Sequence, residues 1–104
     1  MKELFIFNGR IGIDIPKADL DWENLDADSQ QEILVRWEKI RGTIPDRIKE
    51  LERNINEKQE RLNDEEDFSV SCTINTEIAE LASIINELWL WYRINQNISY
   101  KLHI

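Results

Sequence analysis

Four glutamates on two predicted helices are the residues whose spacing could support metal chemistry. They are Glu57, Glu60, Glu77 and Glu80. Carboxylate oxygens that converge from two helices suit Mg²⁺, which can promote the hydrolysis of a phosphate ester. The helical period places all four beside or outside the apolar seam, so the pattern favours solvated carboxylates in pairs such as Glu57 with Arg61.

The spacing of these glutamates resembles that of the all-α nucleotide pyrophosphohydrolases, whose consecutive helices each bring two carboxylates to a magnesium ion on a triphosphate. The resemblance is confined to the carboxylate spacing, and we assign no family on it. It implies Mg²⁺-dependent nucleotide hydrolysis as a remote alternative function.

A second acidic motif begins like a calcium-binding loop. Asp19, Asp21 and Glu23 alternate as the first ligands of such a loop do. The next position holds Asn24 where the loop needs glycine, and the twelfth holds Gln30 where it needs a bidentate glutamate. We therefore expect no calcium site here.

The chain has one cysteine, Cys72, and one histidine, His103. A lone cysteine excludes an internal disulfide and a cysteine-rich metal site. Cys72 precedes a predicted helix start, where a helix dipole can lower the pKa of a thiol, but we expect a small buried filler. His103 lies next to the C-terminus, a poor place for a catalytic base. These patterns predict no catalytic residue, no cofactor and no metal.

The length of 104 residues suits a single domain, 1–104. Acidic residues outnumber basic ones by 21 to 13, a formal net charge of -8, so binding to nucleic acid or to an anionic membrane is not expected. No stretch stays apolar for the roughly 20 residues that a membrane helix needs. The apolar run before Asn8 is too short for a signal peptide. We therefore expect a cytoplasmic protein.

The N-terminal part predicts a β-hairpin arm over 4–15 followed by an acidic connector over 16–28. Asn8-Gly9 favours a type I′ turn between two apolar strands, and Pro16 ends the second strand because it cannot donate to a ladder. Residues 14–32 carry most of the net negative charge.

A helical body is predicted over 29–99, and its first helix covers about residues 29–42. Ser29 and Glu32 form a capping-box pattern at its start. Pro45, after Gly42, favours a break and a second helix over about 44–62, with a single kinked helix as the alternative.

The last predicted helix covers about 74–98 after a loop over 63–72. Its apolar seam repeats at spacings of four and three, through Ile74, Ile78, Leu81, Ile85, Leu88, Tyr92, Asn95 and Ser99. The predicted fold is therefore mainly α, an antiparallel helical hairpin (44–62 and 74–98) with a preceding helix (29–42) and an N-terminal β-hairpin (4–15).

The last helix carries more apolar surface than one seam needs, which suggests burial on several sides. We expect a small, non-catalytic interaction module that self-associates, with a homodimer as the expected state. The candidate interface residues are Trp22, Trp89, Trp91, Phe5 and Phe7. The alternative is an acidic inhibitor or adaptor that docks on a basic partner protein through residues 14–32.

Overall fold

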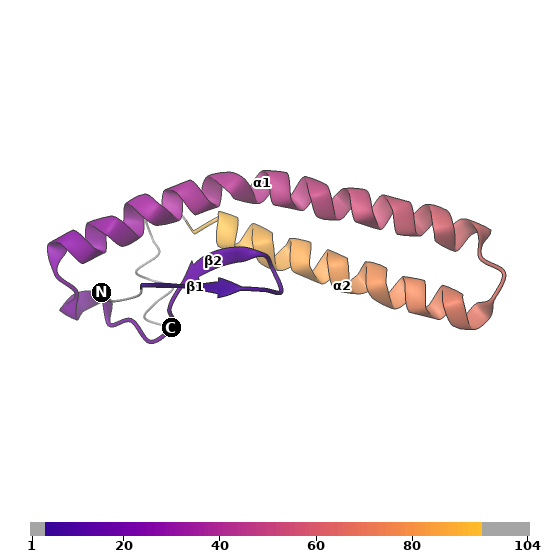
Figure 1. The fold of residues 1–104 in the computed structure, drawn as a ribbon, viewed down its shortest axis with the longest axis horizontal. Helices are drawn as coiled ribbons and strands as arrows, with labels where there is room; N and C mark the ends of the chain where they lie inside the picture. The colour runs from indigo at the N-terminus through magenta and orange to yellow at the C-terminus, as the bar shows by residue number, and fades with distance from the viewer. Residues whose placement is uncertain (1–3, 95–104) are drawn as a thin grey trace.

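The structure, a computed structural model, describes residues 4–94. Two helices, α1 (Ala27–Asp64) and α2 (Phe68–Tyr92), form an antiparallel hairpin, and strands β1 (Phe5–Asn8) and β2 (Ile13–Pro16) form a two-stranded antiparallel sheet beside them (Figure 1). The mainly helical fold predicted from the sequence is confirmed. The molecule is elongated, with principal extents of 59 × 23 × 22 Å.

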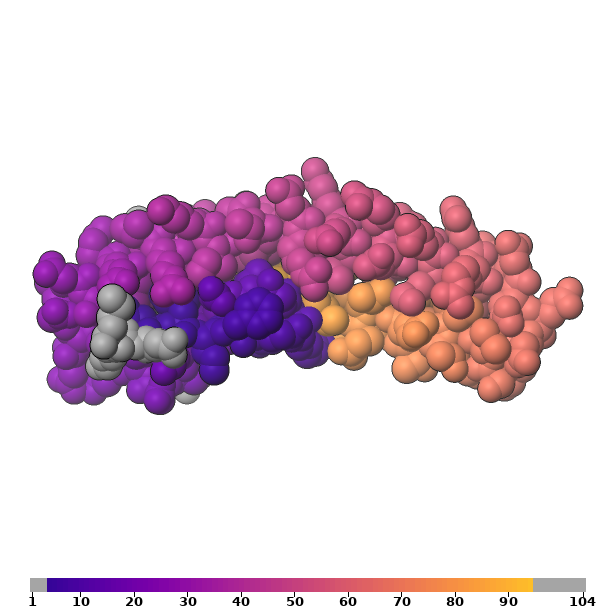
Figure 2. Space-filling view, viewed as in Figure 1, coloured from indigo at the N-terminus to yellow at the C-terminus, as the bar shows by residue number. Residues whose placement is uncertain are grey.

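Helix α1 spans the long axis of the molecule, because its 38 residues at about 1.5 Å each make a rod of about 57 Å. Helix α2 has 25 residues, about 37 Å, and therefore covers only part of α1. The sheet and the connector pack where α2 ends (Figure 2). The β-hairpin thus completes a core that two helices of unequal length leave open.

The predicted break at Pro45 is wrong: residues 29–42 and 44–62 belong to the single helix α1. Proline inside a helix costs about 3 kcal/mol relative to alanine. Ile44 and Ile48, on either side of Pro45, are 0% and 1% exposed, and their burial outweighs that cost. Figure 1 shows α1 bowed, with its concave side toward α2 and the sheet, so the helix bends and does not stop.

Both helices begin earlier than their sequence patterns predicted. The N-cap of α1 is Asp26, whose side chain accepts a hydrogen bond from the Ser29 N–H at 3.1 Å, so Ser29 lies inside the helix and does not cap it. The N-cap of α2 is Asp67, so the loop is 65–67 and not 63–72. Apolar periodicity indicates only the packed part of a helix, and the first residues of α2, Phe68, Ser69 and Val70, are exposed.

Helix α2 also ends earlier than expected, at Tyr92. Donors from α1 satisfy carbonyls near this end: the indole N–H of Trp37 donates to Ile94 O, and Arg41 donates to Tyr92 O at 3.1 Å. These tertiary hydrogen bonds replace the partners that a longer helix would supply. The predicted residues 95–98 lie outside the described part of the chain, as do Ser99 and His103.

The β-hairpin is present, but its turn differs from the type I′ turn predicted at Asn8-Gly9. The loop is 9–12, and Gly12 is the only described residue with a positive φ, of 78°. The Asn8 side chain accepts from the N–H groups of Arg10 and Ile11, at 3.0 and 3.3 Å, in place of a tight backbone turn. This wider loop turns Ile11 into the core, where it is 0% exposed.

Gly42 is an exposed glycine inside α1 with no packing role. A Cβ built there meets no atom within 4 Å. Gly42→Ala is therefore expected to raise the free energy of unfolding by about 1 kcal/mol, because alanine loses less backbone entropy in a helix. Urea unfolding followed by circular dichroism measures this change, and a lower midpoint for the variant would show that α1 needs flexibility before Pro45.

Candidate interaction surface

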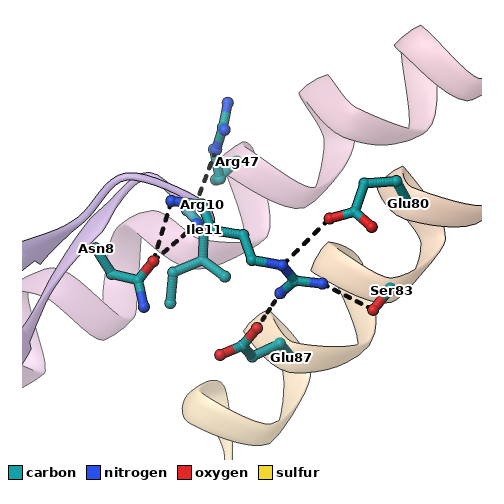
Figure 3. Close-up of polar contacts among 7 residues, drawn as sticks. All are labelled: Asn8, Arg10, Ile11, Arg47, Glu80, Ser83 and Glu87. Carbon is teal, nitrogen blue, oxygen red and sulfur yellow. Dashed lines mark hydrogen bonds and ion pairs between the residues drawn. The ribbon is translucent and has the colours of Figure 1, made fainter. Parts of the chain in front are cut away.

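The hairpin loop is held on α2 by the Arg10 cluster, which consists of Arg10, Glu80, Ser83 and Glu87. Arg10 donates to Glu80 Oε1 at 3.2 Å and to Ser83 Oγ at 2.8 Å, and it pairs with Glu87 (Figure 3). The three partners share one face of α2 because they are spaced by three and four residues. The cluster therefore fixes where the loop lies along α2.

The same loop is fixed to α1 through Arg47. Its Nε donates to Ile11 O at 3.3 Å (Figure 3). The guanidinium also fills the space beside Gly12, where an added Cβ would lie 2.8 Å from Arg47 Nε. Gly12 is thus required both by its positive φ and by this close approach. The loop touches both helices, and the buried Ile11 lies between its two polar anchors.

We expect the Arg10 cluster to contribute little to stability compared with Ile11. The side chains of Arg10, Glu80 and Glu87 are 40%, 60% and 37% exposed, and exposed ion pairs contribute about 0.2–1 kcal/mol each. Arg10→Ala should therefore lower the free energy of unfolding by about 1 kcal/mol. Urea titrations at low and high salt test this prediction. Salt screens the ion pairs, so the free energies of unfolding of the native chain and of Arg10→Ala should lie closer together at high salt. An equal loss at both salt concentrations would contradict an electrostatic origin.

The four glutamates with metal-like spacing do not meet in one site. Glu77 pairs with Lys58 at 3.3 Å, while Glu80 belongs to the Arg10 cluster. Glu57 and Glu60 are exposed. Within residues 4–94, no group of three or more His, Cys, Asp or Glu side chains is placed to hold a metal ion.

The acidic stretch 14–32 is divided between residues with structural roles and residues facing solvent. Asp14 pairs with Arg36 at 3.7 Å, Asp21 accepts from Asn24, and Asp26 caps α1. The exposed remainder comprises Asp19, Glu23, Asp28 and Glu32.

The expectation that Cys72 is a buried filler is wrong, because this cysteine is exposed. It lies in the early turns of α2, where Ile74 is buried at 1% exposure and faces α1. The earlier start of α2 places Cys72 inside the helix, on a face that α1 does not cover.

The structure divides the five candidate interface residues into two groups. Phe5 is 6% exposed, and its ring lies 4.5 Å from the guanidinium of Arg36, so it belongs to the interior of the single chain. Trp22 and Trp91 are half-buried and pack against the core. Phe7 and Trp89 remain on the surface, at 63% and 37% exposure.

Two exposed residues that the sequence analysis did not select extend this surface. Ile6, beside Phe7, and Leu90, beside Trp89, are each 55% exposed. We call Ile6 and Phe7 the β1 patch, and Trp89 and Leu90 the α2 patch. The sequence signal was adjacency: when two neighbouring residues are both large and apolar, one periodic face cannot bury both.

Packing of Trp91 explains why this neighbour of the α2 patch points inward. Its ring makes an edge contact with Trp37, at a centroid distance of 5.5 Å. Trp89 makes a similar edge contact with Tyr92, at 5.4 Å, but on a more exposed side of α2. Such pairs add about 0.5–1.5 kcal/mol beyond area burial.

Comparisons with protein-family models, curated proteins and solved structures found no match for this chain. Neither described helix combines the length and the apolar character needed to cross a membrane.

Proposed function

We propose that this protein is a small, non-catalytic interaction module that associates with a second copy of itself as a homodimer. One observation carries the proposal: the β1 and α2 patches each keep two consecutive large apolar side chains exposed beside the buried core, in addition to the exposed Val35, Phe68 and Val70. A symmetric contact buries a patch on both copies at once. Exposed apolar patches of this kind are typical of binding surfaces.

The free energy gained by covering the exposed side chains favours a moderate affinity between the two copies. Full burial of a large apolar side chain contributes about 1.5–3 kcal/mol, so covering a half-exposed one contributes about 1 kcal/mol. Association itself costs about 4–15 kcal/mol in lost freedom of motion. Side chains of one patch alone are therefore too few, and the contact needs hydrogen bonds in addition.

Sedimentation equilibrium tests the proposal directly. Over concentrations from about 1 μM to about 1 mM, we expect the apparent mass to rise from the monomer value of 12.4 kDa toward twice that value. A mass of 12.4 kDa at every concentration would overturn self-association.

A second candidate function is docking on a basic partner protein. Its support is the exposed group of carboxylates in the acidic stretch: within the described chain, Asp19, Glu23, Asp28 and Glu32 form no ion pair. A pull-down of basic proteins at low and high salt tests this function. The two baits are the native chain and a variant in which these four residues are replaced by the corresponding amides. Loss of one basic protein from the variant alone supports this function, and identical recovery by both contradicts it.

The proposal places the protein in the cytoplasm. The exposed thiol of Cys72 suits a reducing compartment, because an accessible lone thiol is prone to oxidation elsewhere. Cell fractionation with an antibody against the chain tests the location.

A further inference from the structure

The register of the sheet determines which main-chain groups of β1 point outward. Lys17 N–H donates to Leu4 O at 3.0 Å, and Ile6 is paired with Ile15. Because hydrogen-bonded and non-hydrogen-bonded pairs alternate in an antiparallel ladder, Leu4 and Ile6 face β2 and the intervening residues do not. The N–H and C=O of Phe7, which is paired with Asp14, therefore point away from β2.

The two outer edges of this sheet differ in their protection. On the β2 edge, the outward positions are Asp14, a charged residue paired with Arg36, and Pro16, which has no N–H. Charge and proline are the usual devices that prevent an edge strand from pairing. The β1 edge has neither, since its four residues read Phe-Ile-Phe-Asn. Within residues 4–94, no hydrogen bond from another element reaches the main chain of Phe7.

We infer that β1 of one copy pairs antiparallel with β1 of a second copy, with Phe7 opposite Phe7. This inference rests on the proposed self-association and specifies its contact. Two sheets then join into one sheet of four strands, with the protected β2 edges outside. The two Phe7 residues exchange both of their N–H···O=C hydrogen bonds.

Exposure selects the register. A pairing centred on Ile6 would use the outward groups of Phe5, but Phe5 is 6% exposed and Phe7 is 63% exposed. Centring on Phe7 uses the accessible part of the edge and places the two aromatic rings as cross-strand neighbours. No carboxylate belongs to β1, so the net charge of -8 does not oppose the contact through the strand itself.

The β1 patch supplies what the α2 patch lacks. Trp89 and Leu90 lie in the last turn of α2, where their N–H groups bond to carbonyls one turn earlier, so the α2 patch offers a second copy no main-chain donor. The β1 edge offers an N–H and a C=O as well as the side chains of Ile6 and Phe7. These are the additional hydrogen bonds that the size of the patches requires.

Disulfide trapping tests the register. In a Cys72→Ser background, Phe7→Cys places two cysteines on a symmetric pair whose Cα atoms are about 5.5 Å apart, within the range of a disulfide. Mild oxidation should convert most of this variant to a covalent dimer. Trp89→Cys, also on an exposed patch, is the matched control and should form no covalent dimer, because β1 pairing does not bring the two α2 positions together. Efficient trapping by Trp89→Cys and not by Phe7→Cys would overturn β1 pairing and leave self-association standing.

A second variant tests the hydrogen bonds. Phe7→Pro removes the ring and the outward N–H and fixes φ, but it removes no hydrogen bond of the ladder to β2, whereas Phe7→Thr removes the ring and keeps the N–H. Sedimentation should give a dimer dissociation constant about 10- to 100-fold higher for Phe7→Pro than for Phe7→Thr. Circular dichroism checks that both variants are folded.

These measurements separate the two proposals. Equal dissociation constants for folded Phe7→Pro and Phe7→Thr would overturn β1 pairing. If the proline variant unfolds, the disulfide test replaces it: a covalent dimer of Phe7→Cys supports β1 pairing, and its absence overturns β1 pairing. A native chain that stays monomeric at every concentration would overturn both β1 pairing and the proposed function.

Discussion

Replacing Trp37 with alanine is expected to lower the free energy of unfolding by about 3–5 kcal/mol. Trp37 is 0% exposed, contacts the Trp91 ring at a centroid distance of 5.5 Å, and donates its indole N–H to Ile94 O. The substitution removes the buried ring, its contact with Trp91 and its hydrogen bond to Ile94 O, at the point where α1 meets the end of α2. Urea unfolding followed by far-ultraviolet circular dichroism measures the loss.

The matched control for this prediction is Trp89→Ala. Trp89 is 37% exposed and lies on the same turn of α2 as Trp91, so its removal leaves no comparable cavity. We expect a loss of about 1 kcal/mol, mainly from the edge contact with Tyr92. Similar losses for both tryptophans would mean that the end of α2 is not packed as described.

Replacing Ile11 with alanine is expected to lower the free energy of unfolding by about 2–5 kcal/mol. Ile11 is 0% exposed although it lies in the hairpin loop, because the loop carries it between α1 and α2. The cavity would loosen the loop, including the hydrogen bond from Arg47 to Ile11 O. Thermal and urea unfolding at a concentration below dimerisation measure the change.

Ile6→Ala is the control for Ile11, since the same side chain is 55% exposed on β1. We expect Ile6→Ala to lower the free energy of unfolding by less than about 1 kcal/mol, because the position is exposed. Hydrogen exchange of the 9–12 amides gives an independent readout, because the Ile11 variant should lose protection there and the Ile6 variant should keep it. Unchanged protection in the Ile11 variant would contradict the anchoring role of this residue.

The helical hairpin could be predicted because its signal is repeated many times along the chain. Ile44, Ile48 and Leu51 continue one stripe across Pro45, and each is at most 3% exposed. The predicted break rested on Pro45 and not on that continuity. A single local penalty of about 3 kcal/mol was set against several buried side chains, whose burial contributes more in total.

The candidate surface was predicted only in part. Aromatic type alone selected Phe5 together with Phe7, and Trp91 together with Trp89, yet the members of each pair differ in burial. Trp89 and Trp91 point in different directions on α2, whereas Phe5 and Phe7 lie on the same face of β1 and differ in how far the core covers that face. Which side chains are covered depends on where α1 lies. Sequence distance cannot supply that information.

The sequence by itself determined the order and type of the elements, since the apolar period and the scarcity of glycine act locally along the chain, but it did not determine that Pro45 lies inside one continuous helix. Tertiary structure decided which residues are accessible. Helix α1 is longer than α2, and the β-hairpin packs against α1 between Arg36 and Arg47, which buries Phe5 and Ile11 and leaves Phe7 63% exposed. Burial depends on contacts between residues far apart in the chain, such as Arg10 with Glu80. The local pattern of apolar and polar residues does not predict such contacts.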